Sequence, residues 1–382
     1  MKHICVLTGS RAEYGLLKPV IRSIGHHASL ELSLLVTGMH LLPEFGDTYK
    51  EILKDGFKIT EKIPILNGET EALEMPIAIG KGIEKFARSL FRLIPDVLLV
   101  LGDRYESLAG AIAAAYLNIC VAHIHGGDSA RAGLDESARH AISKFAHVHF
   151  PATDTSAERL RKMGEDPWRI RVVGAPALDT ILNTPLLTQD ELTSKYAVSF
   201  DKPVIILVQH ALTTEPKKAG WQMAESLAAI RSIDCLCIVI HPNVDLGGRD
   251  IINEIRKLDH LHDIRSFKSL PQVDYLSFLK HARLLVGNSS SGIIESSSFN
   301  LPVINVGNRQ EGRERSNNVL DVPHDRMAIK EAINRAFTDH GFIEKVRSCR
   351  NPYGDGKTGP QIAGYLNDIY FSKNWIQKKL CY

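Results

Sequence analysis

Short apolar runs alternate with amphipathic stretches along almost the whole of this 382-residue chain. Apolar strands separated by helix-length segments are typical of βαβ units, because parallel strands need a crossover to join them. The expected strands are residues 3–7, 30–36, 97–101, 119–124, 147–150, 170–173, 204–208, 236–240, 284–286 and 303–306. The expected helices are residues 14–25, 72–91, 106–117, 136–145, 155–163, 220–231, 274–281 and 292–299. This alternation predicts an α/β protein in which both halves wind in the same way.

The alternation weakens between residues 175 and 201, and a fresh apolar strand follows. A chain of this length has room for two domains of ordinary size. We therefore expect a Rossmann-like domain at residues 1–185 and a second one at residues 186–360. Residues 359–380 are expected to form one amphipathic helix, so that residues 361–382 pack back on the first domain.

Composition and charge exclude several classes of protein. The 46 Lys and Arg residues nearly balance the 44 Asp and Glu residues, which argues against nucleic-acid binding as the main activity. No apolar stretch is long and continuous enough for a membrane span, and the N-terminus lacks the apolar region of a signal peptide. The six cysteines are scattered, and most of them lie in apolar stretches, which indicates a reducing compartment. We expect a cytoplasmic protein that contacts no membrane.

Polar residues follow seven of the expected strands. Ligands of open parallel sheets bind beyond the carboxyl ends of the strands, so these segments are the first candidates for a site. They are residues 9–13, 102–104, 125–128, 209–210, 241–243, 287–292 and 307–309. Any one of them could be only a turn, but seven from two halves predict two domains that face one cleft.

Residues 287–292, GNSSSG, run directly from an apolar strand into an expected helix. Backbone N–H groups and hydroxyls at such a helix start favour an anion. The segment lacks the lysine of a P-loop and the spacing of a dinucleotide fingerprint, which favours a phosphate or nucleoside diphosphate. Glu295 could accept hydrogen bonds from a ribose and Arg309 could neutralise phosphate, while a plain serine cap and a Glu295–Arg309 pair are the structural alternatives.

Ionisable side chains gather after the expected strands at residues 97–101 and 119–124. They are Asp103, His125, Asp128, Asp135, Glu136, Arg139 and His140. Crowded carboxylates raise one another's pKa, which provides a proton donor and a proton acceptor near neutral pH. Asp135 and Glu136 could instead only begin a helix. His210, from the second half, is a further candidate for proton transfer or phosphate binding.

The run His123-x-His125-x-x-Asp128 also leaves a metal-dependent hydrolase as an alternative. Residues two apart share a face only while a strand continues. Because Gly126 and Gly127 indicate that the strand ends there, we expect His123 to be buried.

Six segments in this order resemble the hydrolysing UDP-N-acetylglucosamine 2-epimerases of sialic and legionaminic acid biosynthesis. They are residues 9–15 (GSRAEYG), 36–40 (VTGMH), 102–106 (GDRYE), 123–128 (HIHGGD), 287–292 (GNSSSG) and 307–313 (GNRQEGR). The resemblance covers about residues 1–360. It implies a glycosyltransferase-B-like fold, with the nucleotide on the second domain and the sugar in the cleft.

The resemblance also implies roles for individual residues. Those expected to hold the nucleotide sugar are Ser290, Ser291 and Gly292 at the diphosphate, Glu295 at the ribose, and Arg11, Arg104, His210, Asn243 and Arg309. Asp103, Asp135 and Glu136 match acidic positions tied to proton transfer, and Arg139 matches a basic position beside them. His125 stands where some relatives carry glutamate, so His125 and Asp128 are both candidates for the base.

The implied reaction is loss of UDP from a UDP-sugar through a glycal-like intermediate, followed by hydration to the free 2-epimer. It requires no metal and no redox cofactor. A nonhydrolysing epimerase and a nonenzymatic nucleotide-sugar sensor remain alternatives, and both N-acetylglucosamine and diacetylbacillosamine remain candidate sugars. The apolar residues 72–91 are a candidate contact for a homo-oligomer.

Overall fold

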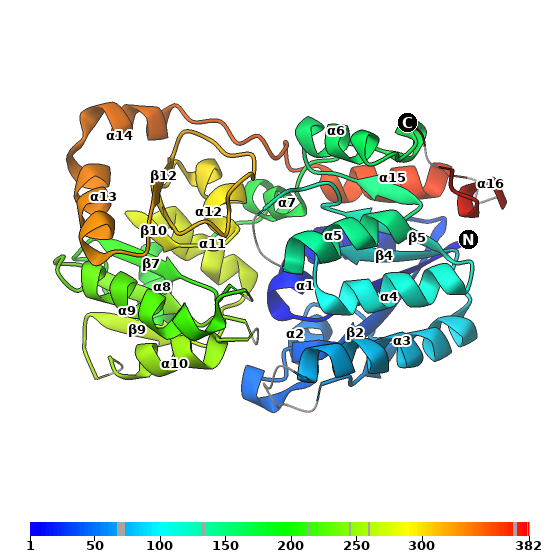
Figure 1. The fold of residues 1–382 in the computed structure, drawn as a ribbon, viewed down its shortest axis with the longest axis horizontal. Helices are drawn as coiled ribbons and strands as arrows, with labels where there is room; N and C mark the ends of the chain where they lie inside the picture. The colour runs from blue at the N-terminus through cyan, green and yellow to red at the C-terminus, as the bar shows by residue number, and fades with distance from the viewer. Residues whose placement is uncertain are drawn as a thin grey trace. The chain divides into compact units, whose positions relative to one another are not determined.

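The computed structural model describes residues 1–66, 73–130, 134–212, 214–243, 246–258, 260–369, 373–379 and 381. The chain divides into two compact units. The first contains Met1–Ser129, Asp135–Leu182 and Tyr353–Tyr382, and the second contains Ala130–Leu134 and Asn183–Pro352. Each is built around a six-stranded sheet of parallel strands (Figure 1), which confirms the predicted α/β class. Among the described residues, no helix has the length and apolar character to cross a bilayer.

The first unit has the strand order β3-β2-β1-β4-β5-β6. Its strands are β1 (Lys2–Thr8), β2 (Leu30–Thr37), β3 (Glu61–Ile63), β4 (Val97–Leu101), β5 (Cys120–Ile124) and β6 (Val148–Phe150). Its helices are α1 (Arg11–Gly25), α2 (Tyr49–Lys54), α3 (Glu74–Leu93), α4 (Tyr105–Tyr116), α5 (Leu134–Phe145), α6 (Asp154–Lys162), α7 (Pro176–Asn183), α15 (Thr358–Asp368) and α16 (Lys373–Ile376).

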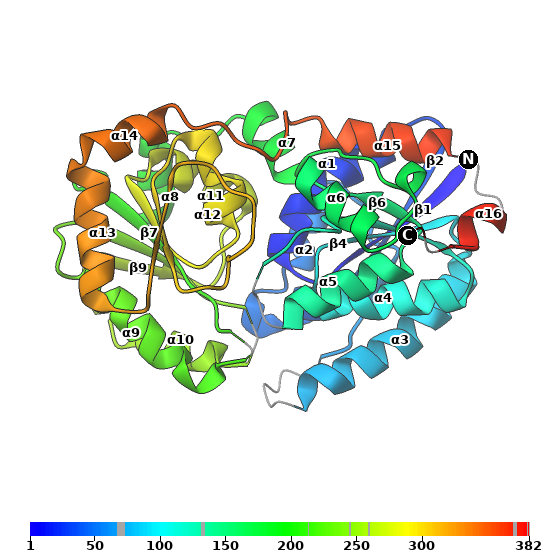
Figure 2. The ribbon, with the colours of Figure 1, turned by 45° about the horizontal axis from the view of Figure 1, so that its top comes forward.

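Both faces of this first sheet are covered by helices. Alternate strand residues such as Val6 and Leu99 pack with α1 and α15 on one face. Their neighbours, such as Leu7 and Leu98, pack with α3 and α4 on the other. Figure 2 shows α15 lying along α1, where a Cβ on Gly359 would stand 2.7 Å from the Pro19 carbonyl. Burial of both faces explains why the strands are continuous apolar runs.

The second unit repeats the architecture with the order β12-β11-β10-β7-β8-β9. Its strands are β7 (Val204–Val208), β8 (Leu236–Ile240), β9 (Ile264–Phe267), β10 (Leu284–Gly287), β11 (Val303–Val306) and β12 (Val319–Val322). Its helices are α8 (Gln189–Tyr196), α9 (Ala219–Ile230), α10 (Gly248–Arg256), α11 (Gln272–His281), α12 (Ser291–Ile294), α13 (Arg326–Thr338) and α14 (His340–Arg347).

Three expected elements are wrong. Residues 170–173 form no strand, since Ile170 makes only an isolated bridge with His149. The helix expected at residues 359–380 ends at Asp368, and a separate helix begins at Lys373. The helix expected at residues 292–299 is the four-residue α12 followed by a 3₁₀ turn, Ser296–Phe299.

Local chemistry explains the short α12, and burial explains three strands that were missed. The Ser296 hydroxyl donates to the Gly292 carbonyl at 2.7 Å and so competes with backbone hydrogen bonding within the helix. The missed strands β3, β9 and β12 lie at sheet edges and have polar or partly exposed residues. They lack the apolar continuity by which the central strands were predicted.

Candidate active site

The candidate acid–base residues of the first unit follow the carboxyl ends of β4 and β5. His125, directly after β5, has a left-handed backbone with φ of 63°, which is uncommon outside glycine. Its Nδ1 atom lies 3.0 Å from Asp128 Oδ2, and Asp128 Oδ1 accepts the Ser156 hydroxyl at 2.8 Å. The two candidate bases are therefore one hydrogen-bonded pair, and both are buried.

Arg139 of α5 gathers the other carboxylates around one buried guanidinium. It pairs with Asp103, which follows β4, and its Nη1 donates to Glu136 Oε2 at 2.8 Å. The same Nη1 donates to the Asp128 carbonyl at 3.2 Å. Burial opposes the charge on Arg139, but the charges of Asp103, Asp128 and Glu136 raise its pKa above the ordinary value. Asp103 and Glu136, which lie 33 residues apart, are thus held at one permanent cation.

Helix α5 explains the spacing of this cluster. It begins at Leu134, so Asp135 and Glu136 occupy its first turn, as the structural alternative expected. Glu136 does more than begin the helix. Its Oε1 accepts the Ser129 hydroxyl at 2.8 Å and lies 3.1 Å from Nε2 of His140, one turn further along. Asp135, on the same first turn, is partly buried.

His123 is fully buried, as expected. Its Nδ1 lies 3.1 Å from the Ser143 hydroxyl and its Nε2 lies 2.7 Å from the Gly102 carbonyl. Burial lowers the pKa of His123 to about 3, so the ring is neutral. Because protein groups occupy both ring nitrogens, His123 is not placed to ligate a metal. Among the described residues, no group of three His, Cys, Asp or Glu side chains is arranged for a metal.

Two buried glutamates, Glu13 and Glu106, contact the turn at Gly9 that follows β1. Neither was selected as a site residue from the sequence. Glu13 accepts the Gly9 N–H at 2.5 Å and hydroxyls of Thr8 and Ser107 at 3.3 Å. Burial, and then the charge of Glu106, raise the pKa of Glu13 to about 7. Glu13 lies in the polar segment 9–13 and in the segment GSRAEYG, whereas the segment GDRYE was the only sequence signal for Glu106.

Glu106, the second of these glutamates, lies between the turn after β1 and Arg104, one of the predicted arginines. A Cβ on Gly9 would stand 2.7 Å from the Glu106 carboxylate, so a larger residue at this turn would displace that buried side chain. Glu106 also accepts Nε of Arg104 at 3.2 Å. Arg11, at the first turn of α1, pairs with Glu51 of α2. Both arginines therefore stand at this edge of the sheet.

In the second unit, the ends of four strands meet at Asn288. The Asn288 side chain accepts the His210 N–H at 2.7 Å and donates to the His210 carbonyl at 2.9 Å. The Asn243 N–H in turn donates to His210 Nδ1 at 3.4 Å. Arg309 and Gln310 donate to the Asn288 carbonyl at 3.1 and 2.8 Å. The structure thus brings His210, Asn243 and Arg309 together, through a residue that sequence analysis did not single out.

The serine turn after β10 lies at the same edge. Gly287 has φ of 128° and passes so close to the Val208 carbonyl that any Cβ would clash. The Ser291 hydroxyl lies 3.0 Å from the Ser289 hydroxyl and 2.6 Å from that of Tyr275. Ser290, which precedes α12, is partly exposed. Because α12 has only four residues, its dipole is weak, and the hydroxyls and turn N–H groups are the candidate donors for an anion.

Gly292 is the second residue of this short helix, and Glu295 is the residue after its end. A Cβ on Gly292 would stand 3.0 Å from Val303, so glycine allows α12 to pack closely on β11. Glu295 directly follows α12 and is buried, and burial raises its pKa to about 7. A buried carboxyl that titrates near neutrality is typical of functional sites.

Two parallel α/β units with polar strand ends define a glycosyltransferase-B-like protein, with a cluster of ionisable side chains on one unit and a serine-rich turn on the other. The chain belongs to the UDP-N-acetylglucosamine 2-epimerase family, whose model matches residues 22–367.

Individual relatives agree with this assignment. The chain is 39% identical to the UDP-N,N'-diacetylbacillosamine 2-epimerase (hydrolyzing) of Legionella pneumophila, over 99% of each chain. It is 34% identical to the polysialic acid biosynthesis protein P7 of Escherichia coli, over 98% of this chain and 96% of that one. A crystal structure of the UDP-GlcNAc 2-epimerase of Neisseria meningitidis bound to UDP-GlcNAc has a TM-score of 0.80 at 19% identity, covering 96% and 99% of the chains.

Proposed function

We propose that this protein is a hydrolysing UDP-sugar 2-epimerase. It converts a UDP-linked 2-acetamido sugar and water into UDP and the free mannosamine-type 2-epimer. The proposal is supported by the family membership and by the 39% identical relative named for a hydrolysing reaction on UDP-N,N'-diacetylbacillosamine. The observation that carries it is the pairing of Asp103 and Glu136 on buried Arg139 at the carboxyl edge of the first sheet.

In this proposal the second unit binds UDP. The diphosphate takes hydrogen bonds from Ser290, Ser291 and the Gly292 N–H, with charge from Arg309. Glu295 accepts hydrogen bonds from the ribose hydroxyls. His210 and Asn243 complete the binding site for the leaving group. Fixed donors of this kind act most strongly when charge develops on the departing phosphate oxygen.

The first unit binds the sugar and moves its protons. A base removes the C2 proton while the bond from C1 to the UDP oxygen breaks, so the electron pair forms a C1–C2 double bond and UDP departs. An acid then returns a proton to C2 from the opposite face, while water adds its hydroxyl to C1 and gives up its remaining proton to a carboxylate or to solvent. Asp103, Asp135, Glu136 and the His125–Asp128 pair are the candidate proton carriers, and Arg11 and Arg104 are candidate substrate contacts.

Arg139 is buried between carboxylates, so we assign it a positioning role rather than direct contact with the sugar. A guanidinium that cannot lose its proton keeps its partner carboxylates ionised and oriented. Opposed proton transfers at C2 need at least two groups in different protonation states. The hydrogen-bonded His125–Asp128 pair is the candidate for the second group.

The decisive experiment uses both candidate sugars in D₂O. Incubation with UDP-N,N'-diacetylbacillosamine or UDP-N-acetylglucosamine should release UDP and a free sugar that is inverted at C2 and carries one deuterium there. We expect faster turnover of the diacetylated sugar, as the name of the Legionella relative suggests. Absence of UDP release from both would refute the proposal. Return of an epimeric UDP-sugar would identify a nonhydrolysing epimerase instead.

We further propose that the protein is cytoplasmic and supplies a sialic or legionaminic acid pathway. The described cysteines are all free, and Cys5, Cys120, Cys235 and Cys237 are buried, which suits a reducing compartment. A mannosamine-type sugar is the product that such a pathway requires. Deleting the gene and measuring loss of surface nonulosonic acid would test this placement.

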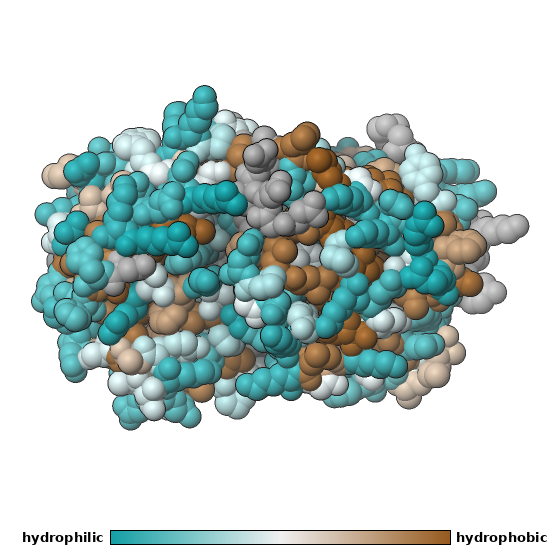
Figure 3. Space-filling model, turned by 90° about the horizontal axis from the view of Figure 1, so that it is seen from below, coloured by the Kyte–Doolittle hydropathy of each residue, from teal (hydrophilic) through white to brown (hydrophobic). Residues whose placement is uncertain are grey.

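Association with further copies of the chain is also part of the proposal. Leu73, Ile77 and Phe91 are large apolar residues exposed on or beside α3. Figure 3, which views the molecule from below, shows apolar side chains grouped on the first unit. Light scattering should give a dimer or tetramer, and Phe91→Ser should shift it towards monomer. A monomeric wild-type chain would contradict this part of the proposal.

A further inference from the structure

The C-terminal segment docks on the first unit away from the proposed substrate groups. The rings of Trp375 and Trp168 meet edge to face with centroids 4.5 Å apart. The buried guanidinium of Arg169 lies over both rings and donates to the carbonyls of Trp375 and His147 at 2.8 and 3.1 Å. Aromatic and cation–π contacts of this kind fix the segment in place.

Beyond this aromatic contact, Lys378 reaches the carboxyl end of α5. Its Nζ donates to the carbonyls of Ala146, Lys144 and Ser143 at 2.6, 3.0 and 3.3 Å. The last carbonyls of a helix have no partner within the helix and attract a cation. Lys378 therefore caps α5 although it lies more than 230 residues further along the chain.

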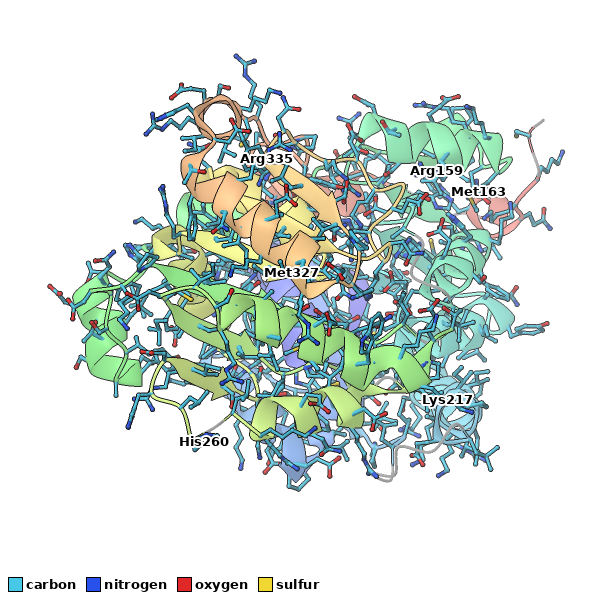
Figure 4. All side chains as sticks on the ribbon, turned by 60° about the vertical axis from the view of Figure 1, so that its left-hand side comes forward. Arg159, Met163, Lys217, His260, Met327 and Arg335 are labelled. Carbon is cyan, nitrogen blue, oxygen red and sulfur yellow. The ribbon has the colours of Figure 1, made fainter. Side chains whose placement is uncertain are left out.

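A buried carboxylate holds the Lys378 ammonium in this position. Glu165 lies 2.6 Å from Lys378 Nζ, and it also contacts Lys144 at 2.6 Å and His149 at 3.0 Å. Burial opposes ionisation of Glu165, but these partners lower its pKa to about 2. Lys144 also donates to the carbonyl of Met163, which directly follows α6 (Figure 4). The cap is thus one member of a buried network.

The other end of α5 carries Glu136 and Arg139. The end of α5 that Lys378 caps is also connected to Asp103 through a chain of side-chain contacts. The Ser143 hydroxyl contacts His123, and His123 contacts the carbonyl of Gly102, which is bonded to Asp103. Movement of the carboxyl end of α5 would therefore displace the partners of Arg139 by two routes.

We propose that Lys378 is a positioning residue for proton transfer. By capping α5 and neutralising Glu165, it sets the position of Glu136 and Arg139 relative to Asp103, without touching the substrate. This inference rests on the proposed function, because it assigns the proton-transfer role to that cluster. It makes the C-terminal segment part of the catalytic machinery rather than a dispensable tail.

Kinetics of the full-length protein test the inference. In Lys378→Met, kcat should fall about 10- to 100-fold, as displaced proton-transfer groups lose their geometry. The dissociation constant for UDP should stay within about twofold, since we place UDP on the second unit. Lys378→Arg keeps the charge and should recover most of the loss. Lys379→Met, at the neighbouring exposed lysine, is the control and should match wild type.

A merely structural role predicts a different result. It would lower the fraction of folded protein but leave kcat per UDP-binding site and the pH profile of kcat unchanged, and that outcome overturns the inference. If Lys378→Met fails to fold because Glu165 is left buried with less neutralising charge, the double variant Glu165→Gln/Lys378→Met removes the carboxylate charge. Its kcat should remain low, and wild-type kcat in that variant would also overturn the inference.

Hydrogen exchange separates this inference from the proposed function. Amides of α5 and Ala146 should exchange faster in Lys378→Met than in Lys379→Met, whether or not the protein turns over a UDP-sugar. Wild-type protein that releases no UDP would refute the proposed function. Unchanged exchange in α5 would refute the anchoring itself.

Discussion

At the scale of single residues, the carboxyl groups of this protein fall into two environments. Asp103 and Glu136 sit against the permanent charge of Arg139. Glu13 and Glu295 are buried, and burial raises the pKa of each to about 7. The first pair suits chemistry that needs oriented carboxylates, whereas the second pair changes charge within the physiological pH range.

Replacing a carboxylate of the Arg139 cluster should separate turnover from binding. In Asp103→Asn or Glu136→Gln, kcat should fall roughly 10²- to 10⁴-fold, the usual contribution of positioned acid–base groups. UDP affinity measured by calorimetry should change less than about threefold. Glu84→Gln, on the exposed face of α3, is the control. Loss of UDP binding with turnover would show that these residues hold the nucleotide instead.

UDP affinity should depend on the ionisation of Glu295. The ionised carboxylate accepts ribose hydrogen bonds, so affinity should be highest above pH 7 and weaken as pH falls through about 7. In Glu295→Gln this pH dependence should disappear, although that of the UDP phosphate remains in both proteins. Calorimetric titrations between pH 6 and 8.5 would compare the two. Identical pH profiles would exclude Glu295 from the ribose site.

At the scale of elements, helix α5 brings the charged cluster together because its two ends contact different parts of the first unit. Glu136 and Arg139 share one face of the helix at a spacing of three residues, which allows side chains to pair. The end of the helix meets His123 through Ser143. The glycine turn before α5 has to leave room for this contact.

Gly126→Ala should disrupt the contact between His123 and α5. A Cβ there would stand 2.9 Å from His123 Nδ1 and 3.0 Å from the Ser143 hydroxyl, which is too close for all three atoms. Urea denaturation should show a loss of about 1–3 kcal/mol in the free energy of unfolding, typical of overpacking. Gly80→Ala, at an open position on α3, should instead be neutral or stabilising. Equal effects at both sites would contradict the packing argument.

At the scale of the whole molecule, buried carboxyls make the free energy of unfolding depend on pH. Glu13 has a folded pKa of about 7 and an ordinary value of 4.5. Between these values the folded state binds more protons than the unfolded state, so this group lowers stability as pH rises. Buried His123, whose pKa is lowered to about 3, acts in the opposite direction below about pH 6.5.

The difference between wild type and Glu13→Gln isolates the contribution of Glu13. The amide keeps the shape and needs no charge, so the variant should gain stability relative to wild type as pH rises from 4.5 to 7. The gain should level off above pH 7 at about 1–3 kcal/mol. Chemical denaturation at a series of pH values would measure it. A difference that does not vary with pH would mean that Glu13 is ionised throughout.

Much of the fold was predictable because its signals are local. Central strands such as β4 and β7 are buried on both faces, so their apolar runs mark them within the sequence alone. Polar segments after the strands located the candidate site, since parallel strands end at one edge. Residues such as Asp103 and Ser291 were selected on that basis, and the motifs in their order indicated the family.

The partners of those residues were decided only by tertiary structure. Nothing local indicates that Asp103 and Glu136 share the guanidinium of Arg139, that Asn288 joins the ends of four strands, or that Lys378 caps α5. The edge strands β3, β9 and β12 and the end of the C-terminal helix were also missed. Sequence patterns report the preferences of neighbouring residues, whereas contacts between distant segments depend on the packing of whole elements. By itself, the sequence determined the strand pattern, the polar strand ends and the family, and the packing determined which charges meet there.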